Sequence, residues 1–247
     1  AMKRVAINGM GRIGRLAFRG LLESAGIEVV AVNEKESLET VAYLLSHDGE
    51  HAPWSGRVSF QGKEEGELVM EDGRRVRAYR REDASDLPWG EMGVDLVLEC
   101  TGAYTSRAKA QAHLDAGARR VLVSAAAGED VPTIVYGINE ETAGEDAIVS
   151  GASCSTVGLA PMAKAINDFA PIESGIATTI HASVTRSGFT ASDLNAAMKE
   201  ASNALFGYTE EQLVSQDAAN MELESMFDAT QTKVRPLDGE VVHEVAS

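Results

Sequence analysis

Residues 8–14 read Asn8-Gly9-Met10-Gly11-Arg12-Ile13-Gly14 and match the pattern G-x-G-x-x-G. With many glycines in the chain the pattern alone is weak, but here it has its required context. It follows an apolar run over residues 3–8 and opens a segment over residues 13–25 whose apolar residues recur at helical spacing. The context predicts a strand–turn–helix unit that binds a dinucleotide.

Each glycine of this motif has an expected task. Gly9 permits a tight turn, Gly11 lets the backbone approach a pyrophosphate, and Gly14 lets the helix pack closely on the strand. The first N–H groups and the positive dipole end of the helix then face the phosphates.

The same motif predicts an acidic residue about 20 residues further on, at the end of the second strand. Glu34 lies there, directly after the apolar run 27–32 and Asn33. A carboxylate at this place accepts hydrogen bonds from the ribose hydroxyls and repels a 2′-phosphate, so we expect NAD rather than NADP. In the alternative interpretation the glycines form an ordinary turn and Glu34 is a surface charge. Lys35 also leaves NADP open.

The pattern of apolar runs predicts an α/β fold. Strand-like and helix-like segments alternate in the first half, which implies a parallel sheet covered on both faces. Near residue 150 the pattern changes. We therefore expect a Rossmann-type NAD-binding domain over residues 1–150, followed by an α+β catalytic domain over residues 151–247. The expected strands are 3–8, 27–32, several within 56–79, 94–98, 120–124, 147–150, 175–182 and two within 227–245; the expected helices are 13–25, 38–45, 106–116, 155–169 (with Pro161 in its first turns) and 193–205.

Composition excludes several classes of partner. The formal net charge of −16 argues against nucleic acid, which needs a basic face. No stretch approaches the ~20 apolar residues that span a bilayer, and no secretory signal precedes the first strand. We expect no membrane association and a cytoplasmic location.

Two cysteines do not make a disulfide framework, so the question is whether either is a nucleophile. Cys154 stands in a Ser/Gly/Thr-rich segment that joins a strand to a helix, where N–H groups stabilise a thiolate and could receive an oxyanion. A lone cysteine is more often a small buried hydrophobe, and this is our interpretation of Cys100. No metal site is expected, because neither cysteine has a second ligand at metal spacing.

Four further residues are candidates. His181, near the end of a strand, could take the thiol proton, although a lone histidine is otherwise structural. Thr101 and Gly102 follow one strand and Ser124 ends the next, where cofactor phosphate, ribose or nicotinamide passes the strand ends. Thr101, Gly102 and Ser124 are interpreted equally well as turn residues.

Longer segments carry a family resemblance. These segments are 8–15, 31–33, 43–45, 88–90, 99–102, 131–139, 152–156, 159–161, 178–182, 206–210 and 227–230, among others. Together they resemble the glyceraldehyde-3-phosphate dehydrogenase family over nearly the whole chain. The distance along the chain from Cys154 to His181 matches the family's catalytic pair.

The resemblance implies an NAD-dependent, phosphorylating aldehyde dehydrogenase of glycolysis. The Cys154 thiolate attacks glyceraldehyde 3-phosphate, His181 accepts the hydroxyl proton as hydride passes to NAD, and inorganic phosphate cleaves the thioester to 1,3-bisphosphoglycerate. The resemblance also implies a homotetramer. Alternatives that it leaves open are erythrose-4-phosphate dehydrogenase and a surface-displayed protein that binds host proteins. Cofactor contacts are assigned to Asn8, Arg12 and Ile13 beside the glycines, and substrate or phosphate contacts to Ser153, Ser155 and Thr156.

The sequence departs from the family in three places. Val157 and Gly158 stand where the family usually has Asn and Cys. After about residue 183 the chain passes quickly to residues 195–199, which match a much later family segment, so arginine-bearing loops that bind anions have no counterpart. The terminal helix and the asparagine that holds the nicotinamide amide are also absent. Either the sequence omits disordered segments of a full-length protein, which we favour, or the chain is shortened; an intact mass near 26.2 kDa would exclude the first.

Overall fold

The computed structural model describes residues 2–46, 56–63, 65–180, 233–237 and 240–246. The chain forms two compact units, Ala1–Val157 and Gly158–Ser247. Among the helices of the described residues, none has the length and apolar character needed to cross a bilayer.

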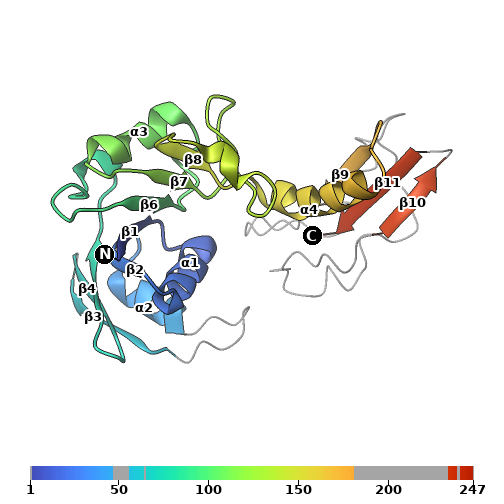
Figure 1. Cartoon of the computed structure of the whole chain (residues 1–247). Helices are drawn as coiled ribbons and strands as arrows, with labels where there is room; N and C mark the ends of the chain where they lie inside the picture. Colours follow the sequence, from blue (N-terminus) through green and yellow to red (C-terminus); the bar gives the residue numbers. More distant parts are fainter. Residues whose placement is uncertain (1, 47–55, 64, 181–232, 238–239, 247) are drawn as a thin grey trace, which may run out of the picture. The chain divides into compact units, whose positions relative to one another are not determined.

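The first unit is built on one eight-stranded sheet (Figure 1). Its strand order is β3-β4-β5-β2-β1-β6-β7-β8. The strands are β1 (Lys3–Asn8), β2 (Ile27–Asn33), β3 (Val58–Gly62), β4 (Gly66–Met70), β5 (Arg75–Tyr79), β6 (Leu96–Glu99), β7 (Val121–Val123) and β8 (Ile148–Ser150); the helices are α1 (Arg12–Glu23), α2 (Leu38–Ser46) and α3 (Arg107–Asp115), with short 3₁₀ turns η1 (Ala84–Asp86) and η2 (Glu140–Ala143).

Six neighbouring strands of this sheet are parallel, in the spatial order β5-β2-β1-β6-β7-β8. Numbered along the chain, these six strands have the order 3-2-1-4-5-6 of a dinucleotide-binding sheet, which confirms the Rossmann-type α/β prediction. The order reverses between β1 and β6, and ligands of such sheets bind beyond the carboxyl ends of the strands at that point. The region 56–79 supplies β3, β4 and β5, and the antiparallel β3–β4 pair extends the parallel sheet at one edge.

Apolar layers cover both faces of the sheet. Alternate residues of a strand point to opposite faces, so Ile7 and Ala6 of β1 enter different clusters. The Ile7 cluster includes Phe18 of α1 and Leu45 of α2, whereas the Ala6 cluster includes Ala84 of η1 and the buried Trp89. A third cluster packs Ala110 of α3 on β7 and β8. Helices α1 and α2 therefore cover one face and α3 the other (Figure 1).

Helix α4 (Cys154–Phe169) follows β8 and crosses the boundary between the two units. It begins one residue earlier than the expected Ser155. Pro161 is its eighth residue, so the expectation that Pro161 lies in the first turns is wrong. The proline ring supplies no N–H, and the helix continues through it with one backbone hydrogen bond fewer.

The second unit contains a three-stranded sheet of order β10-β11-β9. Strand β9 (Ile176–Ile180) is parallel to β11 (Glu240–Ala246), which is antiparallel to β10 (Lys233–Leu237). These strands confirm the predictions of a strand over residues 175–182 and of two strands within residues 227–245. The helix expected over residues 193–205 lies outside the described residues.

Candidate active site

The glycine-rich loop leaves β1 as a tight turn and enters α1. Gly9 has φ +95°, a backbone conformation that glycine adopts without strain. A Cβ at Gly9 would lie 2.8 Å from the Thr101 amide nitrogen, and one at Gly14 would lie 1.9 Å from the Gly9 carbonyl oxygen. A Cβ at Gly11 would meet nothing within 4 Å. The loop is therefore packed where the chain turns and open at the glycine expected to face the pyrophosphate.

The first turn of α1 is suited to an anion. Gly11, the N-cap residue of α1, supplies no side-chain cap, and no acidic residue stands in the first turn of the helix. The N–H groups at a helix start have no partner within the helix, so they can donate to phosphate oxygens. Arg12 is exposed at this turn, and Ile13 keeps 54% of its surface accessible. These residues fit the pyrophosphate of a dinucleotide.

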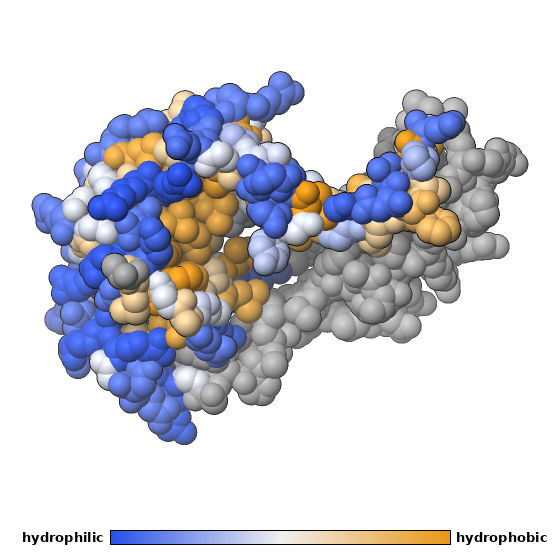
Figure 2. Space-filling model, in the orientation of Figure 1, coloured by the Kyte–Doolittle hydropathy of each residue, from blue (hydrophilic) through white to orange (hydrophobic). Residues whose placement is uncertain are grey.

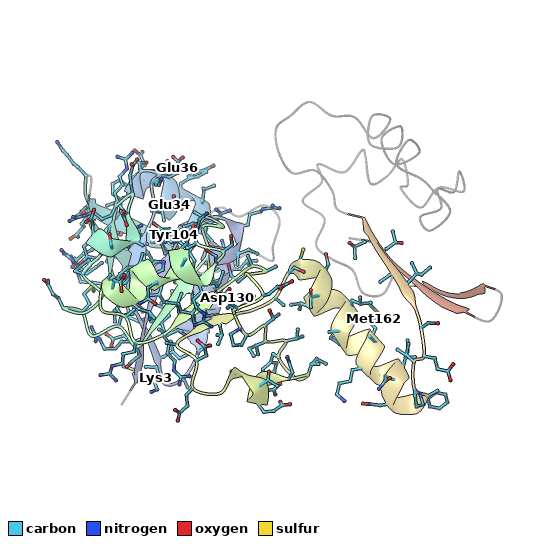
Figure 3. All side chains as sticks on the ribbon, turned by 90° about the horizontal axis from the view of Figure 1, so that it is seen from above. Lys3, Glu34, Glu36, Tyr104, Asp130 and Met162 are labelled. Atoms are coloured by element: carbon cyan, nitrogen blue, oxygen red, sulfur yellow. The ribbon has the colours of Figure 1, made fainter. Side chains whose placement is uncertain are left out.

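Glu34 lies directly after β2, beside the glycine-rich loop. Its Oε2 accepts a hydrogen bond of 2.6 Å from the Met10 N–H, and its Oε1 accepts one of 2.6 Å from the Lys35 N–H. The Arg80 guanidinium donates to the Lys35 carbonyl at 2.6 Å. Figure 3 shows Glu34 on the side of the unit opposite to Lys3, which begins β1. The acidic residue predicted from the motif is thus fixed against the loop.

Three further candidates follow β6 and β7. Thr101 and Gly102 are exposed, and Gly102 has φ +74°. Ser124 is half-buried and its N–H donates to the Glu99 carbonyl at 2.9 Å. All three lie at the carboxyl ends of parallel strands, the same edge as the glycine-rich loop. Apolar residues are visible between α1 and the carboxyl ends of β6 and β7 (Figure 2).

Cys154 is exposed at the first position of α4, four residues after β8 ends. The preceding turn is held by Ala152, a buried non-glycine residue with φ +67°, whose N–H donates to the Ser150 hydroxyl at 3.1 Å. Ser153 caps the helix, because its Oγ accepts from the Thr156 N–H at 3.1 Å and lies 2.8 Å from the Thr156 hydroxyl. The positive φ of Ala152 is strained for a residue that is not glycine, and such strain is costly and clusters at functional sites. Ser155 is half-buried and Thr156 exposed.

Cys100 differs from Cys154 in its surroundings. It is half-buried against the Ile7 cluster and close to the end of β6. Burial raises the pKa of the Cys100 thiol, and a hydrogen bond with Ser124 offsets this only in part. Cys100 thus packs against the core, as expected, but it is only partly buried and lies one residue after β6 ends. His181, the expected base, lies outside the described residues.

Sequence reasoning missed a buried polar network under the glycine-rich loop. Asn8, Asn33 and Glu99 are the last residues of β1, β2 and β6, and each is at most 5% exposed. Asn33 Nδ2 donates to Asn8 Oδ1 at 2.8 Å, and Asn8 Nδ2 donates to Glu99 Oε2 at 2.6 Å. The sequence does contain a signal for this network, because three apolar strands each end on a polar residue.

Within the described ranges, no group of three or more acidic, histidine or cysteine residues could hold a metal ion.

Two family models match the chain. The NAD-binding domain of glyceraldehyde 3-phosphate dehydrogenase matches residues 3–107, and the C-terminal domain of the same enzyme matches residues 153–189. The first match contains the glycine-rich loop, Glu34 and Thr101; the second contains Cys154 and His181. The cofactor of the first unit is therefore NAD.

Curated relatives named glyceraldehyde-3-phosphate dehydrogenase align with most of the chain. The relative from Clostridium pasteurianum is 38% identical over 306 positions, covering 96% of this chain and 90% of the relative. The relative from Lactobacillus delbrueckii subsp. bulgaricus is 38% identical over 304 positions, covering 94% and 89% respectively. The relative from Kitasatospora aureofaciens is 48% identical over 185 positions, covering 73% and 54%.

The first two alignments are longer than the 247 residues of the chain, so these relatives hold internal residues with no counterpart here. Neither the erythrose-4-phosphate alternative nor a host-protein-binding role is supported by these matches. Two domain models and relatives that cover most of the chain agree. The chain belongs to the glyceraldehyde-3-phosphate dehydrogenase family.

Proposed function

We propose that the protein oxidises glyceraldehyde 3-phosphate with NAD and inorganic phosphate, giving 1,3-bisphosphoglycerate in glycolysis. The observation that carries this proposal lies within the first unit. The glycine-rich loop, which is suited to a dinucleotide, follows the carboxyl end of β1. An exposed cysteine at a helix start follows the carboxyl end of β8, a parallel strand of the same sheet. Family membership supplies the reaction class, and the relatives' names supply the substrate.

The glycine-rich loop and the residues around it are proposed to bind NAD. Gly9, Gly11 and Gly14 let the loop follow the pyrophosphate, while Arg12 and Ile13 contact it from the first turn of α1. Glu34 receives the adenosine ribose, and its negative charge disfavours the 2′-phosphate of NADP. Asn8, Thr101, Gly102 and Ser124 complete the cofactor site at the ends of β1, β6 and β7. The domain boundary is proposed near residue 150, just before the nucleophile.

Cys154 is proposed as the nucleophile. Its thiolate attacks the aldehyde carbon to form a hemithioacetal, and N–H groups at the start of α4 donate to the oxyanion. His181 takes the hydroxyl proton as the hydride leaves, and NAD, when bound, accepts that hydride. Inorganic phosphate then attacks the thioester and releases Cys154. Ser153, Ser155 and Thr156 are proposed to contact substrate or phosphate.

The test is NADH formation from NAD, phosphate and glyceraldehyde 3-phosphate, with erythrose 4-phosphate as the competing aldehyde. We expect turnover of the triose that depends on phosphate and is abolished in Cys154→Ser. Cys100→Ser is the matched control and should keep its activity, because that thiol is half-buried and its pKa is raised. Equal turnover by Cys154→Ser and the wild type would reject the nucleophile.

We also propose a cytoplasmic homotetramer without nucleic-acid or membrane partners. The family resemblance supports the tetramer, and the charge of −16 supports the lack of nucleic-acid binding. Light scattering coupled to gel filtration tests the assembly: four chain masses are expected, and a monomer would contradict the proposal.

A further inference from the structure

A buried carboxylate is hydrogen-bonded to the residue that precedes the glycine-rich loop. Glu99 ends β6 and is 1% exposed. Its Oε2 accepts hydrogen bonds from Asn8 Nδ2 at 2.6 Å and from His113 Nε2 at 2.8 Å. Its Oε1 accepts from the Thr101 N–H at 2.7 Å and from the Thr101 hydroxyl. One carboxylate thus receives four hydrogen bonds, from the last residue of β1, from the segment that follows β6 and from α3.

Trp89 fixes the protonation of this cluster. Its indole N–H donates to His113 Nδ1 at 3.1 Å, and an indole can only donate. His113 therefore carries its proton on Nε2, is neutral, and donates to Glu99. Burial acts to raise the pKa of Glu99, but hydrogen bonds from His113, Thr101 and Asn8 outweigh it and hold the pKa below its usual value. Glu99 is a carboxylate whose partners are all neutral donors.

The partners of Glu99 stand on both sides of the point where the strand order reverses. Asn8 ends β1 and precedes Gly9, while Thr101 follows β6. These two segments touch, because a Cβ at Gly9 would lie 2.9 Å from Thr101 Cγ2. Asn8 is also held from the other side by Asn33, whose Oδ1 in turn accepts from the Arg81 N–H at 2.8 Å. The chain of side-chain bonds runs across β2, β1 and β6 to one carboxylate.

We propose that Glu99 is a positioning residue for NAD, which fixes the spacing between the glycine-rich loop and Thr101 without touching the cofactor. The inference rests on the NAD site of the proposed function. Its physical basis is preorganisation: a loop already held in its binding geometry loses less freedom when the cofactor arrives. Hydrogen bonds to a charged group are about twice as strong as those between neutral groups, so one buried carboxylate holds both segments firmly.

Glu99→Gln tests the proposal with almost no change in shape. The glutamine amide has one oxygen and one NH₂, so its NH₂ must face one pair of donors. It cannot face Asn8 and His113 without turning the His113 proton toward the Trp89 N–H. It therefore faces Thr101, whose backbone N–H then loses its partner. We expect the dissociation constant of NAD to rise about tenfold, with the loss in turnover falling on KM for NAD rather than on kcat.

Trp89→Phe is the matched control. It removes the other end of the same network and disturbs the core, but it leaves the Glu99 bonds to Asn8 and Thr101. Calorimetric titration of the full chain with NAD should show wild-type affinity in Trp89→Phe, even though the variant unfolds at lower urea concentration. If Trp89→Phe weakens NAD binding as much as Glu99→Gln, or if Glu99→Gln binds NAD as the wild type does, the proposal is overturned.

A second variant covers loss of folding. If Glu99→Gln gives no folded protein, Glu99→Asp replaces it: the charge stays, but the shorter side chain cannot reach both segments, and weaker NAD binding is again expected. Wild-type affinity in Glu99→Asp would reject the proposal. Because the titration needs no turnover, a wild-type chain that fails to bind NAD at all would instead reject the cofactor site of the proposed function.

Discussion

Exchanging Gly14 for alanine should lower both the stability of the first unit and its affinity for NAD. The new Cβ would lie 1.9 Å from the Gly9 carbonyl oxygen and 3.5 Å from Ile7 Cγ2. Carbon–oxygen contacts are normally no shorter than about 3.3 Å, so helix and loop must separate by about 1.4 Å. Overpacking of this kind typically costs about 1–3 kcal/mol. The same movement displaces the loop proposed to hold the pyrophosphate.

Gly20 on the same helix provides the matched control. It is exposed, and a Cβ there would meet nothing within 4 Å. Alanine in an exposed helix interior is favoured over glycine by about 0.5–1 kcal/mol, so Gly20→Ala should stabilise the unit and leave NAD binding unchanged. Urea unfolding gives the free energies, and calorimetric titration gives the affinities. The reasoning is refuted if Gly14→Ala unfolds and binds NAD like the wild type, or if both variants shift stability in the same direction.

Three further predictions follow from single contacts. Iodoacetamide should alkylate Cys154 much faster than Cys100 at neutral pH, as peptide mass spectrometry can measure, because Cys154 is exposed at a helix start whereas burial raises the pKa of Cys100; equal rates would contradict the nucleophile. A hydrogen bond from the Arg107 guanidinium lowers the pKa of Asp146 to about 2. This pair therefore stabilises the folded chain above about pH 4, where an unfolded aspartate is ionised, and the stabilisation is lost as the pH falls toward 2. Arg107→Gln should therefore lower the urea midpoint at pH 7 by more than at pH 3, and a pH-independent difference would exclude this linkage. Ser106→Ala should cost about 1 kcal/mol in urea unfolding, because the Ser106 side chain caps α3, and unchanged stability would show that the cap contributes nothing.

Local patterns in the sequence were sufficient to predict the parallel sheet. The glycine motif and the apolar runs before it and after it each specify structure through nearby residues. The attachment of β3 and β4 at the edge of the sheet depends on pairings that alternation alone does not reveal. Pro161 was misplaced because the helix tolerates the loss of one backbone hydrogen bond, which propensity rules do not foresee.

The residues of the candidate site could be predicted from the sequence only in part. Motif spacing located Glu34, and the strand-to-helix junction located Cys154 at the start of α4. The network around Glu99 was not found, because it joins residues far apart in sequence: Asn8 and Glu99 are separated by 91 positions. Periodicity reports which residues are buried, but not which buried polar groups satisfy each other.

The central claim is that Cys154, at the start of α4, forms a covalent bond with the aldehyde before the hydride leaves. The direct test is rapid mixing of the chain with NAD and glyceraldehyde 3-phosphate in the absence of phosphate, followed by peptide mass spectrometry. We predict a burst of a single NADH per chain and an acyl group on Cys154. Steady NADH formation without an adduct, or an adduct on any other residue, would contradict it.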